Sequence, residues 1–114
     1  MKIVRFEDII SRQKAKELTI EIYKLFKADN DFSFRGQIER ASVSIMNNIA
    51  EGFERRTNNE FKHFLFIAKG SCGEVRSMLI LARDLNKIKE EDFKKFETLS
   101  IEISKLLSGL IKTL

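Results

Sequence analysis

Apolar residues recur along this chain at intervals of three and four, in four segments that are separated by short polar stretches. This is the spacing of residues that share one face of an α-helix. It predicts four helices, over about residues 7–28, 34–55, 58–86 and 90–113. No linker or repeat interrupts the pattern, so we expect residues 1–114 to form a single domain.

The segment 58–86 carries the longest apolar pattern and is expected to be the most buried helix. Its apolar positions alternate by four and three without a break: Phe61, Leu65, Ala68, Cys72, Val75, Leu79 and Ala82. A 3.5-residue period of this kind is typical of helices that pack in bundles. Together with the short turns, it favours an all-α fold, an up-down-up-down antiparallel four-helix bundle.

Polar residues at the start of each segment predict where the helices begin. Glu7 and Asp8 suit the first turn of the first helix, because acidic side chains stabilise the positive end of the helix dipole. Ser33 is the predicted N-cap of the second helix. Thr57 and Glu60 have the spacing of a capping box, in which each side chain accepts a hydrogen bond from the other residue's amide.

Composition narrows the class of protein. The chain has 114 residues, 43% of them hydrophobic and 33% charged, and it has no proline. These values are typical of a soluble globular protein with long helices. No stretch reaches the ~20 apolar residues that span a bilayer, and the N-terminal residues lack the apolar stretch of a signal peptide. We therefore expect a cytoplasmic protein without a membrane partner.

Catalytic chemistry is not recognisable in the sequence, so we expect no enzyme, no catalytic residues, no metal and no cofactor. Glu60 and His63 form a Glu-x-x-His pair, but a di-iron site needs two such pairs, and His63 is the one histidine of the chain. Cys72 lies on the packing seam and is interpreted as a small buried hydrophobe rather than a nucleophile. Phosphate-binding glycine loops are also absent.

Cations recur every seven residues on the third predicted helix: Lys62, Lys69, Arg76 and Arg83. A seven-residue spacing keeps them on one side of a helix, in a row ~32 Å long at 1.5 Å per residue. Either their stems cover the apolar seam, or the row is a track that meets the phosphates of a nucleic acid in series. Arg55 and Arg56, at the preceding corner, would extend such a track.

The overall charge permits a nucleic-acid partner without demanding one. The formal net charge is +4 and the pI is about 9.3, which is a mild basic excess. Most of the ten phenylalanines fall on packing faces, so platforms on which bases could stack are not evident. Binding is therefore expected to depend on backbone and shape rather than on base sequence.

Another group of small and polar residues lies in the two central helices: Ser44, Asn48, Glu51, Gly52, Gly70, Ser71 and Glu74. The polar members either hydrogen-bond between helices and fix the register of the bundle or line a recognition surface, and we favour the structural interpretation. A glycine inside a helix costs roughly 1 kcal/mol relative to alanine. Gly52 therefore predicts a close approach or a helix end, and Gly70 a place where a partner backbone comes near.

These residues carry a resemblance to a known family. The motifs are Ala-Ser-Val-Ser-Ile at 41–45, Asn-Ile-Ala-Glu-Gly-Phe at 48–53, Ile-Ala-Lys-Gly-Ser at 67–71, and Glu74. They resemble the signature of the four-helix-bundle proteins that are encoded within intervening sequences of bacterial 23S ribosomal RNA genes. The accessory variability determinant of diversity-generating retroelements is similar in fold. The motif region covers about a third of the chain.

The resemblance implies two alternative functions. The first is a non-enzymatic, oligomeric bundle that binds nucleic acid, RNA or DNA, through its basic helix face, with RNA favoured. The second is a protein-interaction adaptor, for example a partner of a reverse transcriptase, without direct contact to nucleic acid.

The resemblance also implies assembly. The family and its retroelement relative form five-membered rings, so we expect a homopentamer. The sequence supports an oligomer independently, because Ile20, Tyr23, Phe66 and Ile80 fall outside the rows that one bundle core requires. In a monomer they would form an exposed apolar patch, which soluble proteins usually bury in an interface.

Overall fold

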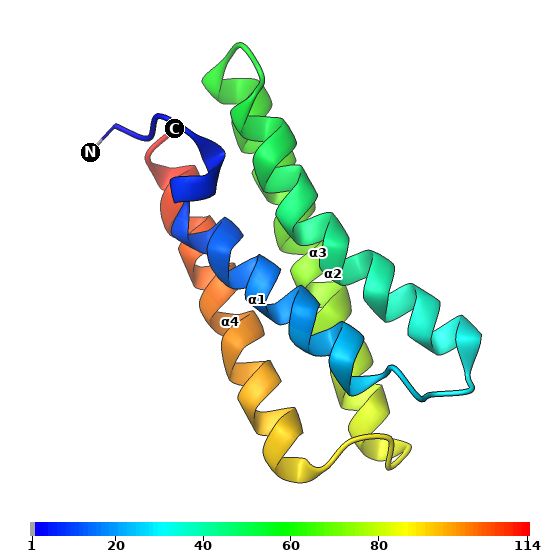
Figure 1. Ribbon diagram of the computed structural model, residues 1–114. Coiled ribbons are helices and arrows are strands. Elements are labelled where there is room, and N and C mark those ends of the chain that lie inside the picture. The colour runs from blue at the N-terminus through cyan, green and yellow to red at the C-terminus, as the bar shows by residue number, and fades with distance from the viewer. Residues whose placement is uncertain (1) are drawn as a thin grey trace.

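The computed structural model describes residues 2–114. They form a short 3-10 helix and four α-helices and contain no strand. The elements are η1 (Phe6–Asp8), α1 (Ile10–Leu25), α2 (Phe32–Phe53), α3 (Asn58–Asp84) and α4 (Glu90–Lys112). Each helix packs against the next and α4 packs against α1 (Figure 1), whereas the backbones of the diagonal pairs, α1 with α3 and α2 with α4, do not approach each other closely. The predicted all-α four-helix bundle is confirmed.

The core lies where the four predicted apolar rows meet. All seven seam positions of α3 are buried. The other helices contribute side chains that are fully shielded from solvent: Leu18 and Ile22 from α1, Ile38, Ile45 and Ile49 from α2, and Ile103 and Leu107 from α4. A single continuous apolar cluster joins all four helices. Burial of this surface is the main stabilising contribution to the fold.

The first helix begins later than the sequence predicts. Glu7 and Asp8 belong to η1, and α1 starts at Ile10. Between them Ile9 has an extended backbone, with φ −74° and ψ 118°, and its side chain is 3% exposed. The chain turns here because Ile9 enters the core, so the two acids do not lie in the first turn of α1.

The second helix begins at Phe32, and its predicted cap is wrong. The carboxylate of Asp31 accepts a hydrogen bond from the Phe34 amide at 3.1 Å, so Asp31 is the N-cap. Ser33 lies inside the first turn and is exposed. Both residue types cap helices well, and spacing alone did not separate them.

The third helix begins with the predicted cap. The Thr57 hydroxyl accepts a hydrogen bond from the Glu60 amide at 3.1 Å. The reciprocal bond differs from the prediction, because the Glu60 carboxylate accepts from the Arg56 amide, also at 3.1 Å, rather than from the Thr57 amide. The corner is therefore closed one residue earlier than a capping box would close it.

The α1–α2 and α3–α4 loops lie together at one end of the bundle, and the α2–α3 corner lies at the other (Figure 1). At the loop end, Asn86 has a left-handed φ of 59°, and the Lys87 amide donates to the Ala82 carbonyl at 2.8 Å. This pattern closes the C-terminus of α3. Lys87 then ties the two loops together through Asp29, with Nζ 2.8 Å from a carboxylate oxygen.

Candidate nucleic-acid interface

All four side chains of the basic row of α3 are half-buried, and three of them, Lys69, Arg76 and Arg83, lie on the flank of the helix that faces α4. The Arg83 guanidinium lies 4.4 Å from the centroid of the Phe93 ring in α4 and donates to the Asp84 carboxylate at 3.1 Å. Arg83 is therefore engaged within the bundle. The other three cations form no salt bridge within residues 2–114.

A groove of about 460 Å³ runs between α3 and α4 beside this row. It is lined by Lys69, Arg76, Ile101, Ser104, Lys105, Ser108, Gly109 and Lys112. Four of these residues are cations, two carry hydroxyl groups and none is acidic. None of the four cations forms a salt bridge within the described part of the chain. We call this surface the α3/α4 groove; it offers charge-assisted donors to an anion.

Two of the groove cations, Lys105 and Lys112, were missed in the sequence analysis. Their spacing is the same seven residues that marks the row on α3. Residues 89–114 carry five cations and five acids, and this balance conceals a local excess. Every acid of this segment lies at position 102 or earlier, so residues 103–114 are purely basic among their charged positions. The seven-residue spacing and the positive charge together could have identified the side of the groove that α4 forms.

The Cys72 thiol shows how α3 and α4 are aligned. It is 1% exposed and donates to the Ser100 carbonyl at 3.1 Å. This contact joins the middle of α3 to the middle of α4, and Lys69 and Lys105 line the same groove near it. Burial raises the pKa of the Cys72 thiol to about 11. The thiol is therefore protonated near neutral pH, and a protonated thiol is a poor nucleophile.

The two arginines of the α2–α3 corner have different surroundings. Arg55 donates to the Glu51 carboxylate at 2.8 Å, and its guanidinium lies 4.6 Å from the centroid of the Phe64 ring. Arg56 is exposed and, with Lys2, lines a hollow of about 340 Å³ at this end of the bundle. The corner therefore extends the basic surface through Arg56 more than through Arg55.

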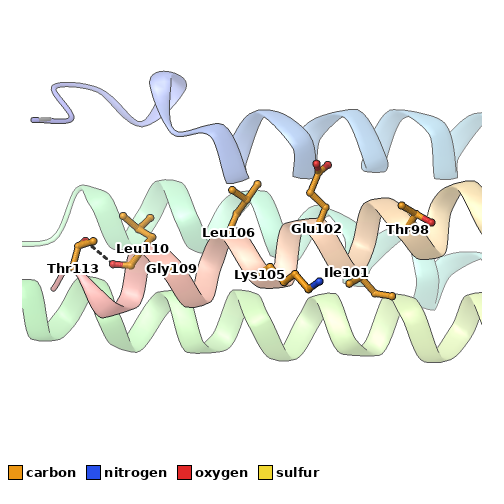
Figure 2. A pocket seen from close by; sticks show the side chains of 8 residues that line it. All are labelled: Thr98, Ile101, Glu102, Lys105, Leu106, Gly109, Leu110 and Thr113. Carbon is orange, nitrogen blue, oxygen red and sulfur yellow. Dashed lines mark hydrogen bonds between the residues drawn. The ribbon is translucent and has the colours of Figure 1, made fainter.

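A more apolar hollow of about 610 Å³ covers the outer side of α4. Figure 2 shows Glu102 and Leu106 directed toward α1, with Lys105 and Ile101 on the other side of the helix. The Glu102 carboxylate lies 3.2 Å from Nζ of Lys14 in α1. The acid of this hollow is thus paired and turned away from the α3/α4 groove.

Polar residues of the family-like motifs join α2 to α3. The hydroxyl groups of Ser44 and Ser71 are 2.9 Å apart. Asn48 donates to the Ser44 hydroxyl at 2.9 Å and to the Ser44 carbonyl at 2.8 Å. A Cβ atom at Gly52 would lie only 2.6 Å from Cβ of Phe64, so the two helices approach each other closely here.

The remaining motif residues lie on the surface, against our expectation of hydrogen bonds between helices. Glu51 pairs with Arg55 in the corner that follows its helix, and Glu74 is exposed without a salt bridge in the described residues. A Cβ atom at Gly70 would meet nothing within 4 Å. These positions lie on the outer rows of α2 and α3, where none of them bonds to another helix within residues 2–114.

Two further classes of site are not formed by the described residues. Within residues 2–114, no group of three histidine, cysteine or acidic side chains is placed to hold a metal ion. His63 is exposed, with its ring 5.7 Å from the Phe64 ring. No helix in this part of the chain has the length and apolar character to cross a membrane.

Comparison with known proteins gives one sequence family and one informative structure. Residues 7–109 match the family described as 23S rRNA-intervening sequence protein. A crystal structure of a protein of unknown function from the S23 ribosomal protein family of Bacteroides thetaiotaomicron is similar, with a TM-score of 0.85 and 29% identity. The match covers 90% of this chain and 99% of that one. Curated protein sequences give no match.

Proposed function

Because this chain belongs to the 23S rRNA-intervening sequence protein family, we propose that it is a non-enzymatic, oligomeric, cytoplasmic protein that binds nucleic acid, preferentially RNA. The observation that carries this proposal is the α3/α4 groove, which is lined by two hydroxyl groups and by four cations that form no salt bridge within residues 2–114. Such a surface matches the charge and hydrogen-bonding capacity of a phosphate backbone.

The groove favours recognition of backbone rather than of bases. Its lining contains no aromatic side chain, and stacking on aromatic rings is a common way to hold an unpaired base. The binding track consists of Lys62, Lys69 and Arg76 on α3 and of Lys105 and Lys112 on α4. Arg83 contributes less, because its guanidinium already contacts Phe93 and Asp84.

We further propose an up-down-up-down antiparallel arrangement of the helices and a homopentameric assembly. The Ser44–Ser71 and Cys72–Ser100 contacts support antiparallel neighbours, since each contact joins residues at similar distances along the chain from the loop that connects the two helices. The pentamer rests on the family resemblance and on the exposed apolar side chains. Five chains of charge +4 would carry +20, which makes a weak single-chain attraction multivalent.

A polarisation titration with structured RNA and with duplex DNA tests the binding proposal. Affinity is expected to fall steeply with salt, and the changes Lys69→Gln and Arg76→Gln should each reduce the salt slope by about one unit. Lys89→Gln and Lys95→Gln are matched controls, because both residues are exposed and lie outside the groove. No binding to either nucleic acid at about 50 mM salt, or equal effects of the two pairs, contradicts the proposal.

Light scattering coupled to size exclusion tests the assembly. A pentamer has a mass near 67 kDa, five times 13.3 kDa, and a species of 13.3 kDa at micromolar concentration contradicts it. The second candidate function is the protein-interaction adaptor, for example for a reverse transcriptase. It is favoured by the exposed apolar side chains of α3, and an oligomer that binds no nucleic acid would support it.

A further inference from the structure

Two exposed apolar faces lie on helices that are diagonal in the bundle. The α3 face comprises Phe66, Ile67, Glu74, Leu81, Asp84 and Leu85. The α1 face comprises Lys16, Ile20, Tyr23 and Lys24. The backbones of α1 and α3 do not approach each other closely, whereas α1–α2, α2–α3, α3–α4 and α1–α4 do. The two helices are therefore diagonal in the bundle, and their outer faces lie on opposite corners.

Both faces expose large apolar side chains to solvent. Phe66, Ile67, Leu81 and Leu85 are 56%, 40%, 46% and 54% exposed, respectively. Ile20 and Tyr23 are 44% and 45% exposed. The surface of α3 is open at Gly70, between these side chains, since a Cβ atom there would have no neighbour within 4 Å.

The charges of the two faces are complementary. The charged residues of the α3 face are acidic: Glu74, which forms no salt bridge within residues 2–114, and Asp84, which is paired with Arg83. Lys16 and Lys24 border the α1 face, and neither lysine forms a salt bridge within residues 2–114. Glu17 and Glu21 lie at the edge of this face, in a hollow that Lys16 and Ile20 also line. Opposite charges of this kind steer association and fix the register of a contact.

One edge of each face also lies on the α2 side of the bundle. On α1, Tyr23 lies one turn beyond Thr19, whose hydroxyl donates to the Ser42 carbonyl of α2 at 3.1 Å. On α3, Ile67 lies one turn before Ser71, which bonds to Ser44 of α2. Residues one turn apart share a helix face. The two contacts that each copy makes would therefore not point in opposite directions. A row of such copies would curve.

We propose that the occupant of the α3 face is the α1 face of a second copy of this chain. The contact uses two different surfaces, so it is heterologous, and a curved series of such contacts closes into a ring. The inference rests on the oligomer in the proposed function and assigns its interface. It leaves the α3/α4 groove on the opposite flank of α3 open to solvent.

A mixing experiment tests this assignment. Leu81→Arg blocks the α3 face and Ile20→Arg blocks the α1 face, because each buries a guanidinium in an apolar contact. Both residues are exposed in the single chain, so far-ultraviolet circular dichroism should show unchanged helix content. Each variant alone is expected to be a 13.3 kDa monomer. The 1:1 mixture should form a complex of twice that mass and no larger, because only one pair of intact faces remains.

Phe32→Arg is the matched control, since Phe32 is 72% exposed and belongs to neither face; it should retain the mass of the parent. The assigned interface is wrong if Leu81→Arg and Ile20→Arg keep the oligomeric mass of the parent, or if their 1:1 mixture remains monomeric. Either result leaves the proposal of an oligomer intact. A parent chain that is monomeric at micromolar concentration overturns both. Groove variants such as Lys69→Gln should not alter the mass in any of these cases, which separates assembly from nucleic-acid binding.

Discussion

At Gly52 a single missing side chain allows α2 and α3 to meet. A Cβ atom there would be 2.6 Å from Cβ of Phe64 and 3.3 Å from the Phe61 carbonyl oxygen. Alanine favours helix by about 1 kcal/mol, but overpacking costs about 1–3 kcal/mol. We therefore expect Gly52→Ala to lower the free energy of unfolding by about 1 kcal/mol and Gly52→Leu to lower it more.

Gly109 provides the comparison for this prediction, because a Cβ atom at that helical position would meet nothing within 4 Å. Gly109→Ala should stabilise the protein by up to about 1 kcal/mol. Urea denaturation at one fixed protein concentration measures all three variants. Equal effects at the two glycines would show that the approach of α2 and α3 at Gly52 does not control stability.

The sequence predicts a close approach or a helix end at Gly52, and the structure shows the close approach. The same argument did not hold at Gly70, where the chain offers no neighbour. A glycine in a helix indicates that a neighbour can come close at that position. The sequence does not say whether this neighbour belongs to the same chain or to another molecule.

At the scale of the elements, helix interiors were easier to predict than helix ends. The seam of α3 follows from spacing alone, because periodicity within one helix is a local property. The start of α1 depends on whether Ile9 reaches the core, which requires the positions of the other helices. The candidate site divides in the same way: spacing on α3 predicted one wall of the groove, whereas the opposite wall depends on how α4 is aligned with α3.

The N-terminus of α2 gives a direct test of a cap that spacing misplaced. Asp31→Ala removes the acceptor for the Phe34 amide and should destabilise the protein by about 1 kcal/mol. Ser33→Ala is the control, since Ser33 is exposed inside the first turn, and it should change the unfolding free energy by less than about 0.5 kcal/mol. Thermal denaturation of both variants decides between the two caps, and the opposite order of effects would restore Ser33.

The loops at the far end of the bundle are held by a pair of residues 58 positions apart. The Lys87 ammonium donates to both carboxylate oxygens of Asp29, at 3.1 and 2.8 Å. This hydrogen bond, with help from the Asp31 amide, lowers the pKa of Asp29 from its usual 3.8. A carboxyl group whose folded pKa is lowered stabilises the fold above its unfolded pKa, and this contribution is lost as the pH falls through the folded pKa.

We therefore expect Asp29→Asn to be less stable than the parent by about 1 kcal/mol near neutral pH. The difference should stay constant down to about pH 5 and shrink below about pH 4, where the parent loses the ion pair. Urea unfolding at several pH values measures both proteins. A gap that is independent of pH would show that the effect of the substitution does not come from the charge of Asp29.

At the scale of the whole molecule, different parts of the surface differ in charge and in apolar character. The groove between α3 and α4 carries cations that form no salt bridge within the described part of the chain. One edge of each proposed contact face lies on the α2 side. Neither region could be predicted completely from sequence, because each depends on which helices are neighbours around the bundle. Sequence periodicity supplied the residues on each helix, and packing determined which of them share a surface.

Tyr23 gives this molecule an optical property that follows from its position. The chain has one tyrosine and no tryptophan, so ultraviolet emission near 300 nm comes from one ring, which is 45% exposed on the α1 face. If that ring enters a neighbouring chain, its emission intensity and anisotropy should change on dilution, without any label. Ile20→Arg, one turn away, should abolish the concentration dependence, whereas Phe32→Arg should preserve it. A signal that stays constant while the mass changes would place Tyr23 outside the contact.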